Sequence, residues 1–211
     1  MRRLTLAVSL LAATTAVANV SHPVSASVAR GQIKRVIIEL ATGELLVRNG
    51  APDRIRVSGE VGCEEDDPGT SQEVKQTGVE IAVDGGDAII RKTGPAHWGF
   101  HGHPNFHLTI ELPRGTSVDF ETKYGELTIE GEFGNIDTDL RAGEIHLRTP
   151  RAAVHELNAS VRVGEVHTDF GDDREDHEGV LPGTTHFINA TGRSRINLHA
   201  TVGELHVTLT R

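Results

Sequence analysis

The chain has 211 residues, with 30 acidic side chains against 21 basic ones and a formal net charge of −9 at pH 7. This acidity argues against nucleic acid and against anionic membrane surfaces as partners. Cys63 is the single cysteine, so the fold must be stabilised by packing and backbone pairing without an internal disulfide.

The first 18 residues have the pattern of a secretory signal. Arg2 and Arg3 precede a mostly apolar stretch, and Ala16-Val17-Ala18 matches a small-x-small cleavage motif. We expect cleavage after residue 18, with a site near residue 29 as the alternative. No segment reaches the roughly 20 apolar residues of a transmembrane helix. We therefore predict an exported protein without a membrane span, placed in the periplasm, on the cell surface or in the medium.

The rest of the chain, residues 30–211, is predicted to be one all-β domain. Residues 33–111 contain segments such as "IKRVIIEL", "DRIRVSGEV" and "NFHLTIEL". Their alternation of apolar and polar residues is typical of half-buried strands, and helical periodicity is almost absent. We expect irregular strands over 33–111 and regular repeats over 112–211.

A Gly-Glu-aliphatic motif recurs along the second half. It begins at Gly125, Gly143, Gly164 and Gly203, with a weaker copy at Gly43. Repeats of about 20 residues indicate a solenoid, here with one strand per coil in each of two facing, largely parallel sheets. The glycine would turn the corner between the sheets, where φ is positive and another backbone passes closely.

The segment 171–183 interrupts the repeat, so the last coil can be aligned in two ways. Matching the motif places Gly203 in line with Gly143. Counting half-coils instead places Gly203 on the opposite sheet, with Arg195 in the position of Glu144. We favour the count, which makes Arg195 the cap of an acidic column.

The outward positions of the repeats form two columns if the coils stack in register. One column holds Glu126, Glu144 and Glu165, and the next holds His146 and His167. These five residues are a candidate surface for a divalent metal or a cationic ligand. The alternative is a solvated face whose charges compensate one another.

The segment "AHWGFHGHPNFH" is a second candidate site. Imidazoles suit zinc, copper and nickel, so His97, His101, His103 and His107 are candidate metal ligands. Trp98 and Phe100 could instead contact a sugar face or a partner protein, or pack on the domain. Zinc or a similar divalent ion is the candidate ligand, and we predict no other cofactor.

The stretch "LPRGTSVDFETKYGELTIEGEFGNIDTDLRAGEIHLRT" resembles the bacterial putative-adhesin family of β-strand-repeat domains, long described as a domain of unknown function. Pro113-Arg114-Gly115 matches the turn of that family, and the Gly-Glu-aliphatic motifs match its corners. The resemblance extends over about residues 33–211. It implies a right-handed β-solenoid-like domain at the cell envelope and brings no catalytic residues.

We therefore predict a non-catalytic envelope protein of the binding or adhesion type, whose partner is an unknown envelope protein or a glycan. One alternative is a metal- or cation-binding periplasmic sensor or buffer that uses the histidines of 97–107. Another is a carbohydrate-active β-helix enzyme with Asp137 and Asp139 as paired acids. The final strand, "GELHVTLTR", is predicted to be an exposed edge that could join a homo-oligomer.

Overall fold

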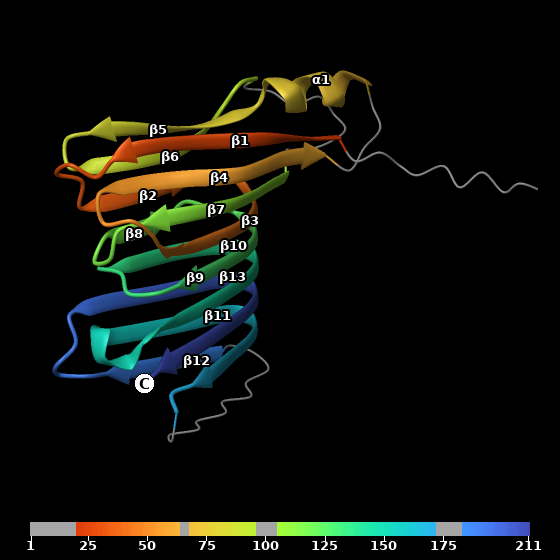
Figure 1. Cartoon of the computed structure of the whole chain (residues 1–211). Coiled ribbons are helices and arrows are strands. Elements are labelled where there is room, and N and C mark those ends of the chain that lie inside the picture. The colour runs from red at the N-terminus through yellow and green to blue at the C-terminus, as the bar shows by residue number, and fades with distance from the viewer. Residues whose placement is uncertain (1–19, 64–67, 96–104, 172–182) are drawn as a thin grey trace, which may run out of the picture.

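A computed structural model describes residues 20–63, 68–95, 105–171 and 183–211 of the protein. In these ranges 13 strands form one hydrogen-bonded sheet, accompanied by one α-helix and one 3-10 turn (Figure 1). The strands are β1 (Val20–Ala29), β2 (Arg35–Glu39), β3 (Thr42–Asn49), β4 (Arg54–Cys63), β5 (Gly78–Asp84), β6 (Asp87–Thr93), β7 (Asn105–Leu112), β8 (Ser117–Phe120), β9 (Tyr124–Glu130), β10 (Ile136–Pro150), β11 (Val154–Asp169), β12 (Gly183–Ile188) and β13 (Ser194–Thr210). The helix is α1 (Pro68–Gln76), and the 3-10 turn is η1 (Arg151–Ala153).

Three strands are unusually long because each continues through a bend. β10, β11 and β13 have 15, 16 and 17 residues, against about five or six in an average strand. Each has a first arm and a second arm that meet at the glycine of the repeated motif. Two pairs of shorter strands, β2 with β3 and β8 with β9, occupy the same two arms but are interrupted at the corner.

The arms pair in an order that differs from the order of the chain. The first arms follow β5-β6-β2-β8-β10-β13-β11-β12. The second arms follow β1-β4-β7-β3-β9-β10-β13-β11. β13, the last strand, is therefore inserted between β10 and β11, and it pairs in parallel with both.

The register of β13 corrects the prediction from counting. Gly203 lies opposite Gly143 on one side and Gly164 on the other, so the motif match was right and the half-coil count was wrong. Arg195 does not cap the acidic column, because it pairs with Glu156 on the first arms, where the two charged groups lie 3.8 Å apart. The prediction that β13 is an exposed edge is also wrong, since it has a partner strand on each side.

The corner glycines form a column of their own, in the order Gly43, Gly125, Gly143, Gly203 and Gly164. Gly203 has φ +139°, a conformation that L side chains rarely adopt. A Cβ atom added there would lie well under 3.0 Å from the Gly143 carbonyl oxygen. Both parts of the expectation for the corner, positive φ and close backbone approach, are confirmed.

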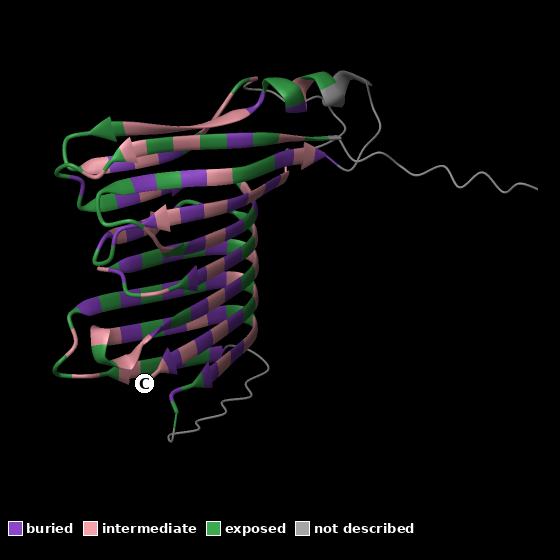
Figure 2. Ribbon diagram, viewed as in Figure 1, coloured by how far each residue is buried: buried purple, intermediate pink, exposed green. Residues whose placement is uncertain are grey.

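Buried residues alternate with more exposed ones along most of the strands, as the stripes of Figure 2 show, whereas β5 has no buried residue. On β10, for example, Ile145 and Leu147 are buried while Glu144 is exposed. The buried aliphatic side chains of both arms belong to one hydrophobic cluster, to which aromatic residues contribute only four phenylalanines. The all-β prediction is confirmed. β10, β11 and β13 pair on both sides of the corner, so the described strands form one sheet where two were expected.

The ends of the sheet depart from parallel pairing. The middle pairs are parallel, as predicted. At one end β4 runs antiparallel to both β1 and β7, and elsewhere β5 runs antiparallel to β6 and β12 runs antiparallel to β11.

β1 pairs along its whole length with β4 and lies between the two candidate cleavage sites. Cleavage after residue 18 would leave β1 in the sheet, whereas cleavage near residue 29 would remove it.

Candidate functional site: a glutamate and histidine face

Five glutamates lie in one row on the outer side of the second arms, one residue after the corner glycines. Neighbouring strands bring them together in the order Glu44, Glu126, Glu144, Glu204 and Glu165. We call this row the glutamate ladder. In-register strands are about 4.8 Å apart, so each pair of neighbouring charges costs about 0.9 kcal/mol in water before screening by salt. The ladder thus concentrates negative potential on one face of the sheet.

Three histidines form a second row, two residues further along the strands. His146, His206 and His167 come from β10, β13 and β11, which are adjacent in that order. The ring centroids of His146 and His206 are 4.7 Å apart with an angle of 6° between the planes. Those of His206 and His167 are 4.8 Å apart at 12°. We call these rings the histidine stack; the parallel register places them on consecutive rungs.

Each imidazole of the stack contacts the glutamate of its own strand. The Nε2 to Oε2 distance is 3.2 Å in all three cases, His146 with Glu144, His206 with Glu204 and His167 with Glu165. His146 also lies 3.9 Å from the carboxylate of Glu126 on the next strand. Residues at positions i and i+2 of a strand point to the same face, so this contact follows from the Gly-Glu-aliphatic-His spacing.

The ladder and the stack together form what we call the ladder face. The sequence predicted Glu126, Glu144, Glu165, His146 and His167 to share this surface, and the structure brings all five together. It adds Glu44, which follows the weaker motif copy at Gly43, and also Glu204 and His206, which the half-coil count had moved to the opposite sheet. The repeat of "GELH" at 203–206 after "GEIH" at 143–146 was the signal that could have placed them.

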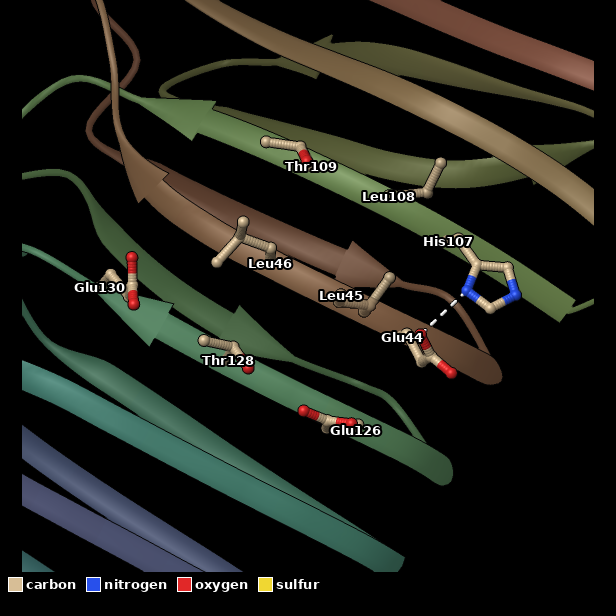
Figure 3. A pocket seen from close by; sticks show the side chains of 9 residues that line it. All are labelled: Glu44, Leu45, Leu46, His107, Leu108, Thr109, Glu126, Thr128 and Glu130. Atoms are coloured by element: carbon tan, nitrogen blue, oxygen red, sulfur yellow. Dashed lines mark hydrogen bonds and ion pairs between the residues drawn. The ribbon is translucent and has the colours of Figure 1, made fainter.

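Beyond the last histidine, the face continues as a shallow depression of about 490 Å³. It lies over β7, β3 and β9, and the histidine positions are occupied there by Thr109, Leu46 and Thr128. Figure 3 shows Glu44 and His107 joined at one end of the depression, with Glu126 beside Glu44 on the next strand. The His107 Nδ1 and Glu44 Oε2 atoms are 2.9 Å apart. His107 thus extends the glutamate row beyond Glu44, and it lies three strands away from His146, the nearest member of the histidine stack.

An apolar strip runs along the corner just before the glycines. Tyr124, Ala142, Val202 and Val163 are consecutive members of this column. Tyr124 is 48% exposed, and Val202 and Val163 are each 46% exposed. The ladder face is therefore bordered on one side by accessible apolar side chains.

The paired acids of the enzyme hypothesis lie elsewhere, on the first arm of β10. Asp137 and Asp139 are both exposed, and Asn197 donates a hydrogen bond of 3.3 Å to Asp137. Asp119 is opposite Asp137 on β8. Partial burial, reinforced by the charges of Asp137 and Asp87, raises the pKa of Asp119, while Arg35 at 3.3 Å opposes the rise.

Of the predicted histidine loop, only His107 is described. His97, Trp98, Phe100, His101 and His103 lie outside the described residues. The metal site proposed for that loop therefore stays a prediction, as does the contact of its aromatic residues with a sugar or a partner.

Comparison with known proteins gives a likeness in structure alone. No family model matches the chain, and no curated protein matches it in sequence. A solved structure described as a putative cell adhesion protein from Clostridium sporogenes aligns with a TM-score of 0.50 and 10% sequence identity. The alignment covers 90% of this chain and 100% of that one. At this identity the match supports a shared fold, and the family resemblance of the repeats remains an inference.

No helix in the described ranges combines the length and the hydrophobicity needed to cross a lipid bilayer.

Proposed function

We propose that the protein is an exported, non-catalytic binding module of the bacterial cell envelope, of the adhesion type and of solenoid-like build. It would act through the ladder face. The observation that carries this proposal is the in-register row of five glutamates on an ordered sheet. The secretory pattern at the N-terminus supports export, and the name of the structural neighbour is consistent with adhesion.

The chemistry of the face favours a protein partner with a row of basic side chains. Repulsion within the ladder is relieved when cations approach it, and the chain as a whole carries a net charge of −9. The exposed apolar strip beside the ladder adds contact area of the kind found at the centre of protein interfaces. Such binding should weaken with added salt, because exposed charges are screened within about 10 Å at 0.1 M salt.

The test compares two triple variants with the same change in net charge. E126Q/E144Q/E204Q removes the middle of the ladder, and E39Q/D84N/E121Q removes three exposed acids that lie elsewhere. The probe is an immobilised lysine-rich peptide, with binding followed by interferometry at several salt concentrations. We expect the ladder variant to lose most of the binding and the control to keep it. Equal loss in both would show that net charge alone matters and would reject the ladder face as the contact surface.

A further inference from the structure

We infer that the histidine stack and the glutamate ladder form a transition-metal site on which two overlapping ligand triads share His206. The inference goes beyond the proposed function. Its test uses a metal ion and no protein partner, so either proposal can fail without the other.

Two groups of three side chains have their ligand atoms mutually within 4.8 Å. One group is Glu144, His146 and His206, and the other is His167, Glu204 and His206. Each group joins two imidazoles to one carboxylate, a donor set that suits zinc, copper or nickel. Three protein ligands with a fourth position open to water is the usual arrangement of an accessible zinc site.

Small movements of the side chains would bring either triad into coordination geometry. Ligand atoms around a tetrahedral zinc ion, with bonds of about 2.1 Å, are about 3.4 Å apart. Atoms that lie within 4.8 Å of one another need therefore approach by at most about 1.4 Å, and each imidazole Nε2 is already 3.2 Å from the carboxylate of its own strand. The side chains of His146 and His206 are each 36% exposed and that of His167 is 41% exposed, so their rings have room to turn.

The electrostatic setting also favours a cation at this place. The glutamate ladder continues on both sides of the shared histidine, and a divalent ion would offset the repulsion between neighbouring carboxylates. Two other charged groups lie further along the same strands. Arg148 follows His146 on β10, and Asp169 follows His167 on β11, with Thr208 between them on β13. The carboxylates of this region thus outnumber its single arginine.

Because His206 belongs to both triads, we expect two results. One chain binds one ion tightly, because His206 can serve only one triad at a time. Replacement of His206 destroys both triads, whereas replacement of His146 or His167 alone leaves one triad complete.

The experiment is calorimetric titration of the full chain with Zn²⁺, accompanied by thermal unfolding with and without the ion. The wild type should bind one Zn²⁺ and gain thermal stability, because ligand binding to the folded state stabilises it. H206Q should lose both effects, as should H146Q/H167Q, while each single variant H146Q and H167Q should keep them. H199Q, on the first arm of the same strand, is the matched control and should behave as the wild type. Urea midpoints in the absence of metal establish that each variant folds.

A chain with His97, His101 and His103 all replaced by glutamine separates the ladder face from the histidine loop. Unchanged Zn²⁺ binding in that chain, with loss in H206Q, supports the inference. Binding that survives in H206Q, or that disappears only when the loop histidines are replaced, would overturn it. Absence of Zn²⁺ binding in the wild type would overturn it as well.

Discussion

Replacement of Gly203 by alanine should be among the most damaging single changes in the protein. Gly203 has φ +139°, in a region that is almost restricted to glycine and costs other residues about 1–3 kcal/mol. Its added Cβ would also lie well under 3.0 Å from a backbone oxygen of Gly143, so β10 and β13 would have to move apart. Loss of one or two backbone hydrogen bonds there adds about 1–2 kcal/mol. The sum, about 2–5 kcal/mol, is a large part of the 5–15 kcal/mol stability of a typical domain.

The control for this change is Gly85→Ala. Gly85 also has positive φ, +60°, but no atom lies within 4 Å of its added Cβ. This variant should cost only the conformational strain of a left-handed residue, about 1–2 kcal/mol. Urea unfolding followed by circular dichroism gives both values from the transition midpoints, provided that the slope with denaturant is unchanged. Equal destabilisation of the two variants would refute close stacking of backbones at the corner.

Two further predictions concern other parts of the sheet. Because burial raises the folded-state pKa of Asp119, stability falls as the pH rises from the ordinary pKa of an aspartate, about 3.9, through the folded-state pKa, above which the loss is complete. The urea midpoint of D119N should therefore rise relative to that of the wild type as the pH increases from about 3, and a difference that does not change with pH would contradict the raised pKa. Truncation before Ser194 removes the strand between β10 and β11 and exposes an edge on each. The truncated chain should aggregate or bind a hydrophobic dye, and a soluble, cooperatively unfolding product would contradict the central position of β13.

The sequence predicted the local structure of the chain better than it predicted the order of the strands in the sheet. Alternation of apolar and polar residues identified strands and their buried sides, because a period of two follows directly from strand geometry. The repeated Gly-Glu-aliphatic motif identified the corners for an equally direct reason, since only glycine tolerates both the positive φ and the close backbone at Gly143 and Gly203.

The order of strands was not predictable in the same way. A count of half-coils assumes that each coil lies on the one before it in the chain. β12 breaks this assumption, because it runs antiparallel to β11 and leads the chain back, after which β13 enters between β10 and β11. Pairing in register depends on side chains that match across strands, and the shared "GE-aliphatic-H" pattern of β10, β11 and β13 satisfies this condition.

The same reasoning explains what was found and what was missed at the ladder face. Five of its members were predicted from spacing alone, since residues at i and i+2 share a face. Glu204 and His206 were missed through the error in register. The central member of the histidine stack, on which both triads depend, was thus absent from the predicted site. The antiparallel ends and α1 had no distinct signal, because strand patterns do not encode direction and helical periodicity over so short a segment is weak.

The position of β13 between β10 and β11 is tested most directly by paired cysteines in a chain where Cys63, the single native cysteine, is replaced by alanine. Glu144 and Glu204 are opposite each other on adjacent strands, so their Cα atoms should be about 4.8 Å apart, within the range of a disulfide. Glu144 and Glu165 are two strands apart, about 9.6 Å, which is too far. After mild oxidation, mass spectrometry of unreduced peptides should show an intramolecular disulfide in E144C/E204C and none in E144C/E165C. A disulfide in the second variant and not in the first would contradict the inserted strand and, with it, the shared histidine of the ladder face.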